Sequence, residues 1–223
     1  MKQKILFILL SILFLNLAFS QNKKTAEATL NKELIAVLDT IDQDDQKYRV
    51  EADELVDKYG WQSKEVQDKW TIIKVKDSIN LIKVEKIITE NGWLGPDIVG
   101  KEGNSTLFLV IQHSKTETQL KYLPMFREAV KKGKAQASDL ALMEDRVLLA
   151  QGEKQIYGSQ IGIDMITNEY ILSPMIDPDN VDKRREEVGL MPLAEYLNHF
   201  DLIWDIEKFK MRMEEYDSAN TKN

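Results

Sequence analysis

Cysteine is absent from the sequence, and histidine occurs only twice in 223 residues. Without cysteine the chain has no disulfide framework, no thiol nucleophile and no thiolate metal site. It also has no residue to carry a lipid anchor after signal cleavage. His113 and His199 lie far apart, with no ligand spacing between them. Because tetrahedral zinc requires three or four ligands, we expect no metal site, and nothing in the sequence indicates a cofactor.

Positive charge is in the minority. The chain has 30 Lys and Arg residues against 37 Asp and Glu residues, which gives a net charge of −7. Nucleic acids and anionic membrane surfaces both require a concentrated basic face. We therefore expect no nucleic-acid partner, and we interpret the basic cluster at 130–134 as the solvated end of a helix.

The only long hydrophobic run lies at the start, in "MKQKILFILLSILFLNLAFSQ". Lys2 and Lys4 precede the apolar residues 5–19, and the small residues Ala18 and Ser20 suit signal peptidase. The run is too short for a confident membrane span, which needs about 20 residues. We predict cleavage after Ser20 and a soluble mature chain, periplasmic or secreted, with no stable membrane anchor.

Hydrophobic periodicity predicts a mainly α fold. Apolar residues recur at helical spacing from Leu30 onward, and a second helix is expected over 66–90 after a break at 60–65. The glycine-rich segment 91–104 is predicted to be a loop. A buried element follows it, with length favouring a helix. Pro124 is expected to break that helix or to start a new one.

The second half of the chain predicts shorter elements. Ser138 is a candidate N-cap for a helix over 139–150, and Gly152 ends that helix. Alternating apolar residues around a turn at Thr167-Asn168 predict a β-hairpin. Short helices are expected after it. We divide the chain into a signal peptide (1–20), a flexible N-terminus (21–29), a single helical domain with this hairpin (30–200), and a C-terminal amphipathic helix with a polar tail (201–223).

His113 stands at the end of the apolar run "LFLVIQ". If the segment is helical, Glu117 lies four residues on and can hold the imidazole in one tautomer, as general bases require. The alternative is a core histidine whose hydrogen bonds are satisfied internally.

Asp145 falls inside the apolar arc of its predicted helix, whereas Arg146 lies about 100° away. A buried carboxylate needs a donor, because burying an unpaired charge is costly. Asp145 is therefore a candidate catalytic residue, which would orient either His113 or a cation. The alternative is a structural role, either in an ion pair or as a carboxylate that caps a neighbouring loop.

Tyr157, Ser159 and Gln160 surround a glycine before the predicted hairpin and are candidates to line a pocket. A bulge or hairpin entry explains the glycine equally well. Trp93, beside a glycine, is either a stacking surface for a ligand or an anchor that pins its loop to the core.

Four phrases together resemble a bacterial family, Domain of Unknown Function 6624: "ENGWLGPDIVGKEG", "LFLVIQHS", "LALMEDRVLLAQGEKQIYGSQ" and "DPDNVDKRREEVGLMPLAEYL". The family pattern has a G-W-P loop, Q-H-A-D, D-R-V and Y-G-T-Q phrases and a final helix pair. The resemblance extends from about Asp45 to Leu197. It places on motif positions the residues Trp93, Gln112, His113, Asp145, Arg146, Gln155, Tyr157, Gly158 and Gln160.

Two departures from the family pattern stand out. Leu94 replaces the usual proline, and Ser114-Lys115 replaces Ala-Asp. If the missing aspartate orients the histidine, this chain has altered or lost activity. The family brings no established reaction.

These residues together predict one polar pocket for a small molecule or an envelope component. In it His113, Asp145 and Arg146 would be catalytic, and Trp93, Gln112, Tyr157 and Gln160 would bind the ligand. Hydrolysis is the expected chemistry if the protein is an enzyme. The alternative is a non-catalytic module that binds a protein through Trp204, Phe209, Met211 and Met213 of the C-terminal helix.

Overall fold

The computed structural model describes residues 30–164 and 169–220. The described residues confirm the mainly α fold with one β-hairpin in the C-terminal half. The signal peptide and the hairpin turn at 167–168 were predicted for residues outside the described ranges. The elements are α1 Lys32–Tyr59, α2 Lys64–Asn91, α3 Pro96–Gln112, α4 Thr116–Lys131, α5 Ala137–Ala150, β1 Ile161–Ile163, β2 Tyr170–Leu172, the 3-10 turn η1 Pro178–Asn180, α6 Val181–Glu187, α7 Leu193–Asn198 and α8 Ile206–Asn220.

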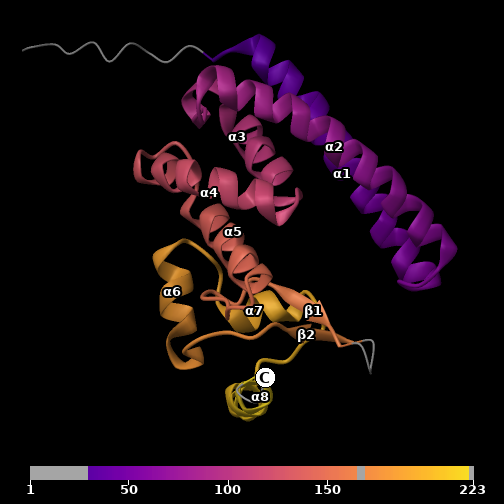
Figure 1. Cartoon of the computed structure of the whole chain (residues 1–223), viewed down its shortest axis with the longest axis vertical. Coiled ribbons are helices and arrows are strands. Elements are labelled where there is room, and N and C mark those ends of the chain that lie inside the picture. The colour runs from indigo at the N-terminus through magenta and orange to yellow at the C-terminus, as the bar shows by residue number, and fades with distance from the viewer. Residues whose placement is uncertain (1–29, 165–168, 221–223) are drawn as a thin grey trace, which may run out of the picture.

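The two longest helices, α1 and α2, form a hairpin along one side of the molecule (Figure 1). The side chains of Asn31 and Ser63 cap their first turns by accepting bonds from the backbone N–H groups of Leu34 and Val66. Gly60 ends α1 with φ of 78°, a conformation that favours glycine. These local signals explain why sequence periodicity located both helices to within a few residues.

The predicted loop at 91–104 is wrong over most of its length, because α3 begins at Pro96. Proline is favoured in the first helical turn, where its missing N–H is not needed. Gly100 has φ of 73° and kinks the helix, while a Cβ at Gly103 would lie 3.1 Å from Leu38. The glycines therefore serve a kink and a close helix contact rather than a loop.

The predicted break at Pro124 is also wrong, because α4 continues through it. Pro124 is exposed, and it deprives the carbonyl of Leu120 of its helical hydrogen bond. Tyr122, Leu123 and Phe126 are buried around it and hold the helix against the core. The actual break lies at 113–115. Ser138 is inside α5, whose N-cap is Gln136.

The buried side chains form two clusters. The first is formed by residues of the helices from α1 through α5. It includes Phe126, whose ring centroid lies 4.4 Å from that of Trp93. The second lies under the β-hairpin and includes Leu193, Phe209 and Met213. Figure 1 shows the two groups of elements at opposite ends, with α5 extending between them.

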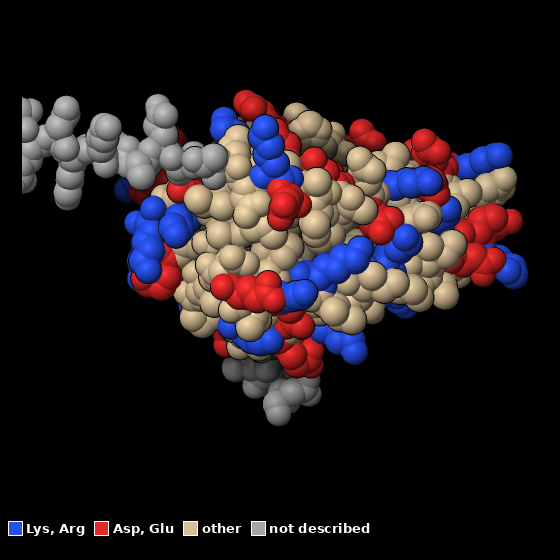
Figure 2. Space-filling model, turned by 90° about the horizontal axis from the view of Figure 1, so that it is seen from above, with Lys and Arg blue, Asp and Glu red and all other residues tan. Residues whose placement is uncertain are grey.

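The face seen in Figure 2 carries basic and acidic side chains intermixed, without a large area of one sign. Within residues 30–164 and 169–220, no helix combines the length and apolar character that a membrane crossing requires.

Candidate functional site

His113 lies directly after α3, and α4 begins only at Thr116. The chain between them is not helical, so the expected stripe joining His113 to Glu117 does not exist. Asp45 on α1 takes the partner's place. The Nδ1 atom of His113 lies 3.1 Å from Oδ1 and 3.0 Å from Oδ2 of Asp45.

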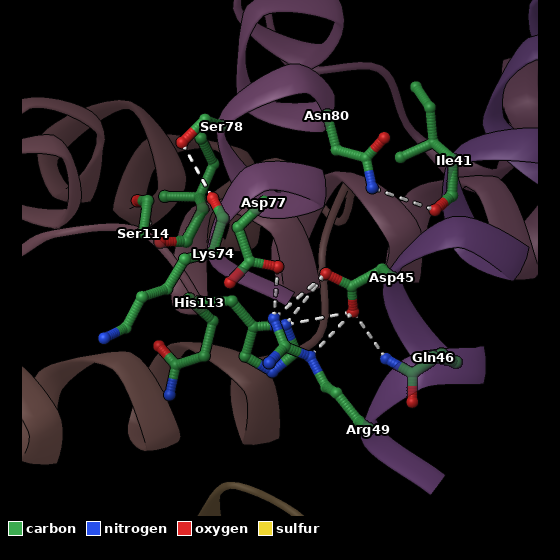
Figure 3. Close-up of polar contacts among 12 residues, drawn as sticks. Ile41, Asp45, Gln46, Arg49, Lys74, Asp77, Ser78, Asn80, His113 and Ser114 are labelled. Carbon is green, nitrogen blue, oxygen red and sulfur yellow. Dashed lines mark hydrogen bonds and ion pairs between the residues drawn. The ribbon is translucent and has the colours of Figure 1, made fainter. Parts of the chain in front are cut away.

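Asp45 is the centre of a polar network between α1, α2 and α3 (Figure 3). It is 2% exposed and accepts a 2.7 Å hydrogen bond from Gln46 and longer bonds, both 3.4 Å, from Arg49. Arg49 also donates to Asp77 on α2 at 2.6 Å. Burial alone would raise the pKa of Asp45, but the bond and charge of His113, together with Arg49, lower it below its usual value.

This contact fixes the tautomer of the imidazole. An ionised carboxylate only accepts hydrogen bonds, so Nδ1 of His113 carries the proton that Asp45 accepts. The other ring nitrogen, Nε2, is then an acceptor when the ring is neutral. Nε2 has no hydrogen-bond partner in the described part of the chain, and the His113 side chain is 20% exposed. A base oriented by a buried carboxylate is therefore available to a ligand.

A pocket of about 330 Å³ lies against His113, between α3, α5, α7 and the segment that leads into β1. Its wall combines apolar and polar side chains, and no Asp or Glu is among them. The apolar side chains are Phe108, Leu109, Leu142, Ile161 and Phe200, and the polar ones are Gln112, His113, Arg146, Ser159, Gln160 and Tyr196.

Arg146 gives this pocket its charge. Its guanidinium donates to the Gln112 carbonyl at 2.7 Å and to Oε1 of Gln160 at 3.1 Å. It makes no ion pair with any carboxylate of residues 30–164 and 169–220. Burial and the neighbouring positive charge of Arg49 lower the pKa of Arg146. The Arg146 side chain is half-buried, and a cation in such a place normally has an anionic partner, which the described residues do not supply.

Gln112 leaves a second group without a partner beside the pocket. The side chain is 4% exposed, and its Nε2 donates to the Leu142 carbonyl at 3.3 Å. Its Oε1 is buried and accepts no hydrogen bond in the described structure. Buried polar atoms are rarely left unpaired, so this oxygen is an exception beside the pocket, although it is not exposed to it.

Asp145 has a different environment from the one predicted for a catalytic residue. It is fully buried and accepts hydrogen bonds from the backbone N–H groups of Ile156, Tyr157 and Ser159 and from the Ser159 hydroxyl, at 2.7 to 3.2 Å. None of these hydrogen bonds involves His113, and Asp145 does not line the pocket. This is the loop-capping arrangement that the sequence left open.

The remaining predicted site residues fall into two groups, those that line the pocket and those that do not. Gln112 and Gln160 line the pocket with His113 and Arg146. Tyr157 does not, and its backbone carbonyl accepts a 2.7 Å bond from Arg185. Trp93 is buried against Phe126 and does not line the pocket. The structure thus brings together four of the seven residues, and it uses Asp145 and Tyr157 to shape the loop that carries Gln160.

Three residues of the site escaped the sequence analysis: Asp45, Arg49 and Asp77. A signal for Asp45 was present, because Leu38, Ile41 and Asp45 fall on one helical stripe. The same reasoning that singled out Asp145 therefore applied here. Among the described residues, no group of three or more potential metal ligands lies together.

A protein-family model matches residues 28–210, under the description "Family of unknown function (DUF6624)". The chain belongs to the DUF6624 family. The predicted resemblance is confirmed over most of the chain. Comparison with curated proteins and with solved structures found no match. In this member, the D-R-V phrase supplies one loop-capping carboxylate, Asp145, and one pocket cation, Arg146.

The departure from the DUF6624 pattern at Ser114-Lys115 has a local explanation. Lys115 is the N-cap of α4, with extended backbone angles of −65° and 155° and no side-chain cap. Aspartate is strongly favoured at such a position. The aspartate of the family pattern therefore fits a helix cap, while Asp45 is the residue that orients His113.

Replacing Lys115 by aspartate is expected to raise the free energy of unfolding by about 1 kcal/mol. The new carboxylate would accept a bond from the first turn of α4 and sit favourably in the helix dipole. Urea denaturation at pH 7 measures the change. The control is Lys132→Asp at the other end of α4, where negative charge should be unfavourable. A Lys115→Asp protein no more stable than wild type would contradict the cap assignment.

Proposed function

We propose that the chain binds a small molecule carrying a carboxylate or phosphate group in the pocket beside His113. The observation that supports this best is Arg146, a half-buried cation on the pocket wall without a carboxylate partner among the described residues. Arginine suits such ligands because its planar guanidinium presents paired donors to two oxygens.

We further propose that the pocket hydrolyses an ester bond in this ligand. Nε2 of His113 takes a proton from a water molecule, and the water oxygen forms a bond to the carbonyl or phosphoryl centre. The bond from that centre to the leaving oxygen then breaks, and the imidazolium returns its proton to the leaving group. Asp45 holds the ring and stabilises the imidazolium. If export occurs as the sequence predicts, the substrate is an envelope component or an imported molecule.

Binding is tested first, on the chain from Gln21 onward. Isothermal titration with inorganic phosphate, short dicarboxylates and phosphomonoesters should find at least one ligand. The Arg146→Gln variant should bind it about 10- to 100-fold more weakly, the loss expected for one charged hydrogen-bonding partner. The matched control is Arg127→Gln, which removes a half-exposed arginine paired with Glu144. Equal affinity in wild type and Arg146→Gln would contradict the binding proposal.

Turnover is tested separately with nitrophenyl esters that carry a carboxylate or phosphate group. The His113→Gln variant should lose about 100-fold or more of its turnover, the usual contribution of a general base, while it keeps ligand affinity within a few-fold. Binding that depends on Arg146 but occurs without turnover would favour the second candidate, a non-catalytic binding module.

A non-catalytic module could also bind a protein through the C-terminal helix, but this alternative has less support. Phe209 and Met213 of α8 are 5% and 8% exposed because they pack in the second buried cluster. Met211, at 58% exposed, and the neighbouring Ile203, at 90%, are the apolar side chains left for a partner.

A further inference from the structure

Helix α2 carries a second apolar stripe that no described element covers. Ile72, Val75, Ile79 and Ile82 are 43%, 56%, 44% and 70% exposed. The buried side of the same helix, with Ile73 and Val84, packs inward. Four large aliphatic side chains exposed along one face of a helix commonly mark an interaction site.

The spacing of the stripe is that of a coiled-coil seam. Its members follow one another at intervals of three, four and three residues. At 100° per residue they fall within an arc of about 80°. The same arc continues to Asp68 before the stripe and to Lys86 after it. An apolar centre is therefore bounded by an acid at one end and a base at the other.

This order is self-complementary when two copies of α2 pair in opposite directions. If the two-fold axis crosses the helix pair at the level of residue 77, Ile72 faces Ile82 of the second copy, and Val75 faces Ile79 of the second copy. The acidic end of each stripe then faces the basic end of the other, so that Asp68 faces Lys86 twice. In a parallel pair, by contrast, Asp68 would face Asp68 and Lys86 would face Lys86.

We propose that two copies of this chain associate through antiparallel pairing of their α2 helices. The residues beside the seam agree with this arrangement, because the same symmetry places Lys64 opposite Glu90. Within one chain Lys64 pairs with Asp68, and Lys86 lies 4.0 Å from Glu90. All four of these side chains are at least 58% exposed, so their present pairing is weak and can be exchanged.

The position of α2 allows this association. Figure 1 shows the α1–α2 hairpin along one side of the molecule, with its tip extending away from the other elements. Asp77 lies on the inward side of α2, where it contacts Arg49. The seam is therefore on the face of α2 opposite the polar network, and dimer formation leaves the pocket beside His113 open. The proposal is independent of the proposed function.

The first test measures the mass of the chain from Gln21 onward by sedimentation velocity, from about 1 to 500 µM. One seam of four residues per copy is small, so a dissociation constant in about the micromolar range is expected. Ile79→Glu should raise that constant about 100-fold or more, because it places a charge in the centre of the seam. Ile203→Glu, at another highly exposed isoleucine, should leave it unchanged. Thermal melts of both variants verify their folding.

The second test determines direction. Asp68→Lys alone and Lys86→Asp alone should each weaken the dimer about 10-fold, whereas the double exchange should restore it. In a parallel pair the single exchanges replace one like-charge contact by another and change little. The proposal is overturned by a wild-type chain that stays monomeric up to 500 µM, by a dimer insensitive to Ile79→Glu, or by a double exchange no tighter than the single ones.

Discussion

Replacing Asp145 by alanine should lower the free energy of unfolding by about 3 to 5 kcal/mol, the range seen when one partner of a buried charged network is removed. The carboxylate accepts from three backbone N–H groups and one hydroxyl between Ile156 and Ser159. Alanine leaves all four donors without an acceptor in a dry interior. Since whole domains are stable by only about 5 to 15 kcal/mol, the variant should be close to unfolded at 37 °C.

Urea denaturation followed by circular dichroism measures this loss. The matched control is Glu144→Ala, the preceding residue of α5, whose side chain pairs with half-exposed Arg127 and should cost about 0.5 kcal/mol or less. Ser159→Ala removes a single donor and should cost about 1 kcal/mol. If Asp145→Ala lost no more than the control while ligand binding disappeared, Asp145 would be a site residue after all.

The helices could be predicted because their signals are local. Ser63 caps α2 by bonding three residues ahead, and the stripe of apolar residues repeats within each turn. The hairpin strands were predicted from alternation, and they pair antiparallel, with Ile161 opposite Leu172. In each case the residues that determine the element are neighbours in the chain.

Two of the wrong expectations, at Gly100 and Pro124, come from residues whose conformation depends on their surroundings. A left-handed glycine is compatible with a loop or with a kink between two helical segments, and a proline is compatible with the end of a helix or with a distorted turn inside one. Which of these applies is decided by packing against α1 and by exposure. Neither is encoded in the immediate neighbours.

The candidate site was predicted in outline, since His113, Arg146, Gln112 and Gln160 meet at one pocket. Burial could be read from periodicity, but the partner of a buried group could not. Asp45 reaches His113 across 68 positions, and Asp145 turns toward the loop 11 to 14 positions ahead. The two carboxylates were alike in sequence, and only the tertiary structure assigns one to the histidine.

Replacing Asp45 by asparagine should have the second large effect, a loss of about 2 to 4 kcal/mol at pH 7. The neutral amide removes one of the two carboxylates that balance Arg49 and leaves only Asp77, and it cannot accept bonds with both of its terminal atoms. The imidazole should also lose its fixed tautomer, which ¹⁵N chemical shifts report directly. With only two histidines in the chain, His113 is assigned by comparison with a His199→Gln protein.

The pH dependence separates this electrostatic role from simple packing. The pKa of Asp45 is lowered in the folded chain, so its contribution to stability is present above about pH 4, the unfolded value, and is lost as the pH falls through the folded value. The gap between wild type and Asp45→Asn should therefore narrow in acid. The pKa of Asp77 is shifted in the opposite direction, because burial raises it despite the nearby charge of Arg49. Its ionised form opposes folding, so the stability of wild type relative to Asp77→Asn should fall as the pH rises above about 4. Urea denaturation of wild type and both variants between pH 3 and 7 measures these differences. If the free energy of unfolding of each variant differed from that of wild type by the same amount at every pH, both assignments would be contradicted, since packing losses do not depend on pH.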